Sequence, residues 1–83
     1  MRLVYFAAVR EAIGVAFETC DLPAHVRNIH DAIDWLAGQS SGHALAFQDK
    51  ARLRFALDQA MVPLDAALCD AHELAIFPPV TGG

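Results

Sequence analysis

The sequence has little of what nucleic-acid binding requires. Its 83 residues include one lysine, Lys50, and five arginines against ten acidic residues, which gives a net charge of −4. A protein that binds the phosphate backbone needs clustered positive charge. Because the chain has no basic stripe, we do not expect a nucleic-acid partner.

Long apolar runs and cysteines are also scarce. The opening apolar run Leu3–Val9 is far too short to span a bilayer, and no cleavage-site pattern of a secretory signal follows it. We therefore expect a cytoplasmic protein with no membrane partner, in which Cys20 and Cys69 stay reduced as small, buried apolar side chains. The four histidines lack the spacing of metal ligands, so we expect no metal site and surface or turn positions for His25, His30, His43 and His72.

Apolar residues dominate the composition instead. They make up 55% of the chain, and charged residues only 19%, which is not the composition of a disordered protein. A chain of this length forms one small domain with a thin core. The surplus of apolar side chains therefore points first to a surface that a partner covers, and only second to a cleft of the chain's own.

Hydrophobic periodicity predicts strands separated by one main helix. Asn28 is a good N-cap, and the apolar residues from Ile29 to Ala37 recur at helical spacing, which predicts an amphipathic helix closed by Gly38. A short turn, or one turn of helix, is expected at Arg10–Gly14, and a second short helix at His43–Gln48. Alternation or β-branched and aromatic content predicts strands at Leu3–Val9, Val15–Cys20, Arg52–Asp58, Met61–Val62 and Glu73–Phe77.

This order of elements predicts an α+β fold of the β-grasp, or ubiquitin-like, type. A mixed sheet of four or five strands would pack on the one main helix. Residues 1–77 would form the domain and residues 78–83 a flexible, extended tail. In the core, side chains of the helix would meet one face of the sheet; the expected contacts join Ile29, Ile33 and Leu36 to Leu53, Phe55 and Leu57.

The tail has the composition of a carrier of activated acyl groups. Pro78 and Pro79 end the sheet and stiffen the chain, and Gly82 and Gly83 leave the last carboxylate sterically open. A carboxylate is a poor electrophile, so it must first become a mixed anhydride, for example with AMP. A sulfur donor could then displace AMP to give a thiocarboxylate, or an amine could displace it to give an isopeptide bond.

Both ends of the chain resemble a known family. The ending Phe77–Gly83 (Phe-Pro-Pro-Val-Thr-Gly-Gly) and the opening segment Phe6–Gly14 are similar to those of the small sulfur-carrier subunit of molybdopterin synthase, a ubiquitin-like family. Two positions depart from the pattern. Ala71 and His72 stand where the family has Gly-Asp, which would strain a turn that needs positive φ at Ala71, and Asp58 replaces an asparagine.

The resemblance implies a role in molybdenum cofactor biosynthesis. A separate adenylating enzyme, using ATP and Mg²⁺, would activate Gly83, and a sulfur donor system would convert it to a thiocarboxylate. The tail Pro78, Pro79, Val80, Thr81 and Gly82 would enter the large catalytic subunit, where the sulfur helps convert cyclic pyranopterin monophosphate to molybdopterin. The family assembles as a heterotetramer of two small and two large subunits. The chain itself would be neither an enzyme on its own nor the binder of a cofactor.

The last strand indicates where a partner would bind. If Leu74 and Ile76 face the helix, Phe77 lies on the opposite face beside the tail. Aromatic anchors with a polar rim are typical of protein interfaces. We therefore predict an interface that contains Phe77, Phe6, Val4 and Arg54.

Two alternatives remain open from the sequence. One is another diglycine protein of the same fold, either the thiamine-pathway sulfur carrier or a modifier attached to lysines. The other is a plain β-grasp binding module whose tail has no chemical role. The Pro-Pro-Val before Thr-Gly-Gly favours the molybdopterin carrier over the first alternative.

Overall fold

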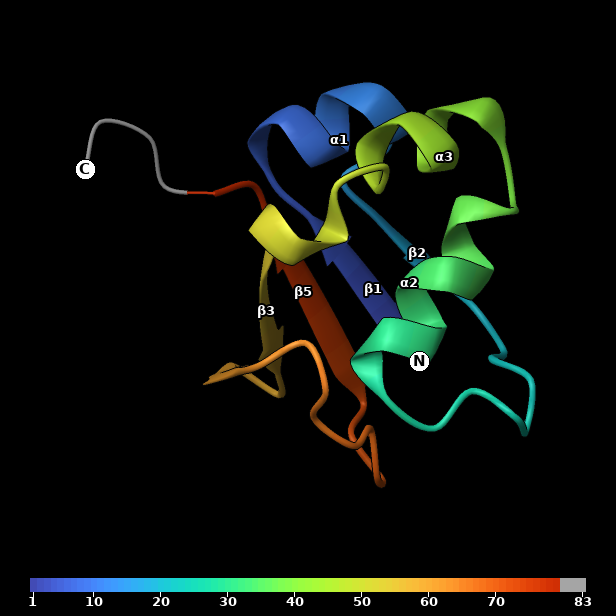
Figure 1. The fold of residues 1–83 in the computed structure, drawn as a ribbon, viewed down its shortest axis with the longest axis vertical. Helices are drawn as coiled ribbons and strands as arrows, with labels where there is room; N and C mark the ends of the chain where they lie inside the picture. The colour runs from blue at the N-terminus through green and yellow to red at the C-terminus, as the bar shows by residue number, and fades with distance from the viewer. Residues whose placement is uncertain (80–83) are drawn as a thin grey trace.

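The computed structural model describes residues 1–79, and a five-stranded sheet forms its centre (Figure 1). The strand order is β2-β1-β5-β3-β4. The first and last strands of the chain, β1 and β5, run parallel at the middle, while the other pairs are antiparallel. The strands are β1 (Arg2–Tyr5), β2 (Phe17–Thr19), β3 (Arg54–Leu57), β4 (Ala60–Val62) and β5 (Glu73–Phe77). This mixed sheet confirms the predicted β-grasp fold.

The main helix, α2 (Ile29–Ala37), forms where the sequence predicts it. The Asn28 Oδ1 atom accepts a hydrogen bond of 2.7 Å from the backbone N–H of Asp31, which satisfies one of the free donors of the first turn. The apolar stripe of the helix faces the sheet, and Ile29, Ile33 and Leu36 have no exposed surface. The N-cap at Asn28 and the apolar stripe together fix this helix at Ile29–Ala37.

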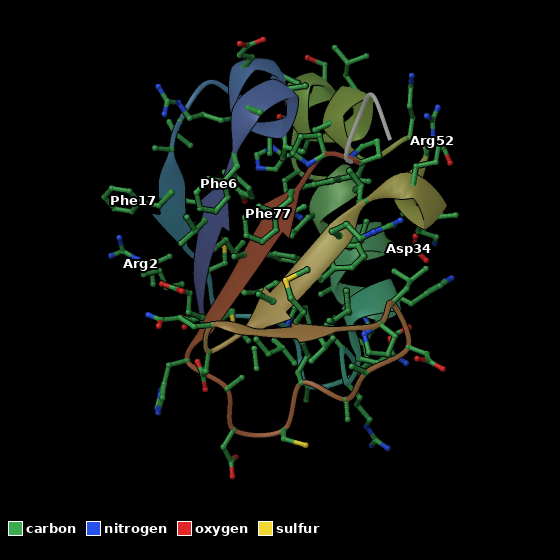
Figure 2. The ribbon with its side chains drawn as sticks, turned by 90° about the vertical axis from the view of Figure 1, so that its left-hand side faces the viewer. Arg2, Phe6, Phe17, Asp34, Arg52 and Phe77 are labelled. Atoms are coloured by element: carbon green, nitrogen blue, oxygen red, sulfur yellow. The ribbon has the colours of Figure 1, made fainter. Side chains whose placement is uncertain are left out.

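The core lies between α2 and the inner face of the sheet. Alternate residues of the two central strands point inward and are buried, namely Leu3, Tyr5, Leu74 and Ile76. Phe55 and Leu53 join them as expected, whereas Leu57 is only half-buried. Leu68, in the irregular segment before β5, also fills the core. Within residues 1–79 the helices cover this face alone, so the other face of the sheet has no helix from that part of the chain over it (Figure 2).

The first predicted strand is too long. β1 ends at Tyr5, and Ala7–Ile13 forms a helix, α1, that closes at Gly14 with φ of 97°. Alanine is the strongest helix former, and Val9 gains burial by entering this helix. Packing of α1 against α3 (Ser41–Ala46) therefore overrides the strand preference of the run (Figure 1). The chain enters α1 through Ala7, whose φ of 50° lies in the left-handed region.

Other differences are local. The predicted strand over residues 15–20 shortens to β2, and Lys50–Arg52 form a short 3₁₀ helix, η1, ahead of β3. The second short helix begins at Ser41 rather than His43, because the Ser40 hydroxyl accepts from the backbone N–H of His43. Gly38 ends α2 with ordinary helical φ rather than the left-handed conformation.

The turns near β5 also correct two expectations. Positive φ falls at Cys69, at 49°, and not at Ala71, so the predicted strain at Ala71 is wrong. Cys69 is exposed, which contradicts its expected burial, while Cys20 is half-buried. Asp58 and Gln59 have φ of 47° and 73° and form the tight turn between β3 and β4. None of the helices within residues 1–79 has the length and hydropathy needed to cross a bilayer.

Candidate interaction face and tail base

A row of apolar side chains crosses the open face of the sheet. The strand register places one residue from each strand side by side, in the order Phe17, Val4, Ala75, Ala56 and Met61. The two alanines at the centre are small and almost fully covered, while Phe17 and Met61 at the two ends are 53% and 63% exposed. The face is therefore low in the middle and bounded by larger apolar groups.

Two aromatic rings stack where β5 ends. The ring centroids of Phe6 and Phe77 are 4.5 Å apart with an interplanar angle of 9° (Figure 2). Phe6 is 41% exposed and Phe77 half-buried. Arg54 pairs with Phe77 across the β3–β5 ladder and is exposed at the edge of the stack. Offset stacking of this kind fixes both rings as a rigid apolar platform.

The platform continues into the start of the tail. A groove of about 540 Å³ is lined by Phe6, Ala7, Arg54, Met61, Phe77, Pro78 and Pro79. The two prolines lack a backbone N–H, so the chain leaves the sheet here rather than extending β5. The tail therefore begins at one end of the apolar face. It starts next to Phe6 and Phe77, the only stacked aromatic pair among residues 1–79.

The opposite rim of the face is polar. The Arg2 guanidinium lies 4.3 Å from the centroid of the Phe17 ring, and its Nε atom is 3.6 Å from Glu73 Oε1 (Figure 2). A cation over an aromatic face is attracted by the ring quadrupole. An apolar centre with charged residues at its edge has the anatomy of a protein-binding surface.

The structure brings the predicted interface residues together. Phe6, Phe77 and Arg54 line one groove, and Val4 lies half-buried in the adjoining row. Sequence reasoning missed Phe17 and Met61. Their alternation within their own strands was visible, but their position relative to Val4 depends on the pairing register. The predicted tail residues Val80, Thr81, Gly82 and Gly83 lie outside the described residues.

A second polar cluster lies under the edge strand β2. The Glu18 Oε2 atom accepts hydrogen bonds from the Tyr5 hydroxyl at 2.5 Å and from His43 Nε2 at 2.6 Å. The other ring nitrogen of His43 lies 2.6 Å from Ser40 Oγ. His43 is only 8% exposed, so its expected surface position is wrong. The cluster joins β1, β2 and the start of α3.

The cluster shifts the pKa of its acidic groups. Burial raises the pKa of the Tyr5 hydroxyl far above its ordinary value, and the hydrogen bond to Glu18 raises it further. Burial also acts to raise the pKa of Glu18, but the hydrogen bonds from Tyr5 and His43 outweigh it, so the pKa of this carboxyl is lowered. The thiol of Cys20 has a raised pKa because of burial and the nearby Glu18 charge.

These arrangements separate the apolar groove at the tail base from the titratable cluster. In the part of the chain described, no three His, Cys, Asp or Glu side chains gather where they could hold a metal ion. The groove of about 540 Å³ at the tail base is lined by apolar groups and one arginine, while the titratable cluster lies under the other edge of the sheet. The geometry can present a tail to another protein from an apolar platform.

Comparison with known proteins identifies the family. The model of the ThiS family matches residues 3–83, which is nearly the entire chain. The chain belongs to the ThiS family. This ThiS-family chain is 36% identical to the molybdopterin synthase sulfur carrier subunit of Escherichia coli. The match covers 100% of the chain and 99% of that relative. It is 35% identical, with the same coverage, to the subunit of the same name from Haemophilus influenzae.

Solved structures agree with this assignment. The ThiS-family chain superposes on small archaeal modifier protein 1 of Haloferax volcanii with a TM-score of 0.73 and 25% identity. The match covers 96% of this chain and 97% of the archaeal protein. The fold and the length are therefore shared with proteins whose names describe both sulfur carriage and protein modification.

Proposed function

We propose that the chain is a sulfur carrier of molybdenum cofactor biosynthesis. One observation carries this proposal: the chain matches proteins named molybdopterin synthase sulfur carrier subunit over its whole length, at 35–36% identity. The sequence Gly82-Gly83 agrees with that function, because glycine has no side chain to hinder the carboxylate of Gly83.

In this proposal, Gly83 carries the chemistry and the folded body carries recognition. The Gly83 carboxylate attacks the α-phosphorus of ATP and releases pyrophosphate, which leaves an acyl adenylate. A sulfur donor system then delivers sulfur at the sulfide oxidation level to the acyl carbon, the bond from that carbon to AMP breaks, and AMP and a thiocarboxylate result. ATP and Mg²⁺ belong to the adenylating enzyme, and the chain holds no cofactor of its own.

The partner would be the large catalytic subunit of molybdopterin synthase. Two small and two large subunits would form a heterotetramer in the cytoplasm, and the thiocarboxylate would help convert cyclic pyranopterin monophosphate to molybdopterin. The small chain would have no activity alone. The platform of Phe6 and Phe77 supports this proposal, because a partner that receives the tail must also contact its base.

A second candidate is a protein modifier. It is favoured by the structural match to small archaeal modifier protein 1. Both candidates activate the same carboxylate, but they differ in what displaces AMP. In a carrier a sulfur species is the nucleophile, whereas in a modifier the amine of a target lysine attacks and an isopeptide bond forms.

Deletion of Gly82 and Gly83 tests whether the tail has a chemical role. The truncated chain should bind the large subunit through its apolar face but support no molybdopterin formation in a reconstituted reaction with activating enzyme, ATP and sulfur donor. The full chain treated identically is the control. A truncated chain with full activity would overturn the proposal and favour the plain binding module.

A further inference from the structure

The chain has one lysine, and that lysine belongs to a segment whose neighbouring residues lie at the base of the tail. Lys50 is the first residue of η1. Asp49 and Arg52, its neighbours in this segment, line a hollow of about 400 Å³ on the helical side of the tail, and Pro78 and Pro79 form part of the same hollow. The η1 segment and the tail base are therefore adjacent.

The length of the tail allows its end to approach the η1 segment. From Pro79, four further residues can extend about 13 Å at roughly 3.3 Å each. An activated Gly83 can therefore come close to η1. Arg52, at the hollow, cannot attack an acyl adenylate, because a guanidinium stays protonated and is not a nucleophile. A lysine amine, in contrast, becomes a nucleophile when it loses its proton.

The Lys50 side chain is directed away from the hollow. Its Nζ atom donates to the Asp34 carboxylate on α2, and Lys50 is absent from the residues that line the hollow. Its side chain is 27% exposed, against 57% for Asp34. Asp34 also lies 3.4 Å from His30 Nδ1. Figure 2 shows Asp34 and Arg52 on the same side of the molecule.

We propose that Asp34 is a positioning residue that keeps the only lysine of the chain from attacking its own activated C-terminus. The inference rests on the proposed activation of Gly83. In the reaction that Asp34 suppresses, the Lys50 nitrogen forms a bond to the acyl carbon of the adenylate. The bond from that carbon to AMP breaks, AMP leaves, and the amine proton goes to water. The product is an isopeptide that can no longer accept sulfur.

The test uses the full chain with activating enzyme and ATP·Mg²⁺ and omits the sulfur donor. Intact-mass analysis follows the product that is lighter than the free chain by one water, or the corresponding dimer, and peptide mapping locates the bond. We expect Asp34→Ala to form these products roughly two- to fivefold faster than the unchanged chain, the factor that loss of one exposed ion pair allows.

Two further variants make the result specific. Asp31→Ala removes the same charge from the same helix but leaves the Lys50 partner in place, so its rate should equal that of the unchanged chain. Adding Lys50→Arg to Asp34→Ala should abolish the product. An Asp34→Ala rate no higher than that of Asp31→Ala, or a product that persists without Lys50, would overturn the inference.

Pyrophosphate release, measured in the same reactions, separates this inference from the function on which it rests. Equal release from all variants, with no difference in isopeptide, would contradict only the role of Asp34. No release from any variant would overturn the proposed activation of Gly83 and the inference together.

Discussion

The half-buried Glu18 carboxylate accepts hydrogen bonds from two donors at the edge of the sheet. The Tyr5 hydroxyl and His43 Nε2 both reach its Oε2 atom, and no side-chain polar atom buried in residues 1–79 lacks a partner. Removing the charge of a shared acceptor weakens both hydrogen bonds, and hydrogen bonds to charged groups stabilise a fold by about 1.5–3 kcal/mol. We therefore expect Glu18→Gln to lower the free energy of unfolding at pH 7 by about 1–3 kcal/mol.

The pH dependence of this loss has a definite sign. The pKa of Glu18 is lower in the folded chain than its ordinary value of 4.5, so the carboxylate stabilises the fold fully above that pH. The stabilisation falls as the pH drops below 4.5 through the lowered folded-state pKa. Urea unfolding of both chains from pH 7 to pH 3 should show the difference narrowing. A difference that stays constant would refute the role of the charge.

At the scale of elements, the contact between α1 and α3 depends on a glycine. A Cβ atom added to Gly42 would lie 2.5 Å from the carbonyl oxygen of Ala12, a backbone atom that cannot turn away. Alanine is otherwise about 1 kcal/mol better than glycine in a helix. The clash should exceed that gain, so we expect Gly42→Ala to destabilise the chain by about 1–3 kcal/mol.

Gly38→Ala provides the matched control for this prediction. A Cβ atom at Gly38 would lie an ordinary 3.5 Å from the Trp35 carbonyl oxygen, and the residue has helical φ. The free energy of unfolding of Gly38→Ala, measured by urea titration, should therefore stay within about 0.5 kcal/mol of that of the unchanged chain. If both glycine variants behave alike, the close approach of α1 and α3 does not limit stability.

Mutations on the open face of the sheet should affect partner binding directly. Phe77→Ala removes one ring of the stack with Phe6, and central aromatic anchors commonly contribute 2 kcal/mol or more to binding. We expect affinity for the large subunit to fall by about 30-fold or more. The isolated domain should still unfold cooperatively, because Phe77 lies outside the main core.

Isothermal titration calorimetry of the large subunit with each variant measures this change in affinity. His30→Ala, which changes an exposed residue of α2 on the opposite side of the sheet from the open face, should leave the affinity unchanged. Loss of cooperative unfolding by Phe77→Ala with unchanged affinity would instead place Phe77 in the core.

At the scale of the whole molecule, local signals decided how much of the fold the sequence could predict. The helix α2 and the strand β5 were predictable because capping or alternation agreed with burial. The boundary between β1 and α1 was not, since residues 7–9 suit either conformation and only packing against α3 selects the helix. The burial of His43 depends on Glu18, 25 residues away, which no local pattern reveals.

The candidate site, like the fold, was predictable only in part. Phe77, Phe6 and Arg54 could be placed together because they adjoin the tail in a simple β-grasp. Phe17 and Met61 required the register of four strand pairs, a property of the assembled sheet. The apolar surplus of the composition is thus distributed across one whole face of the sheet rather than around a single pocket.

At this scale the size of the molecule can be compared with the reach of its predicted tail. Its radius of gyration is 11.6 Å, while the six residues of the predicted tail can span about 20 Å. A tail of this length could extend into another protein while the folded part binds that protein's surface. We therefore expect sulfur to be carried at Gly83.

One measurement tests that claim most directly. The chain is incubated with activating enzyme, ATP·Mg²⁺ and a sulfur donor, and its intact mass and C-terminal peptide are determined. We predict exchange of one oxygen for sulfur, confined to Gly83 and dependent on ATP. An unmodified C-terminus, or a chain recovered only as isopeptides on lysines of other proteins, would contradict it.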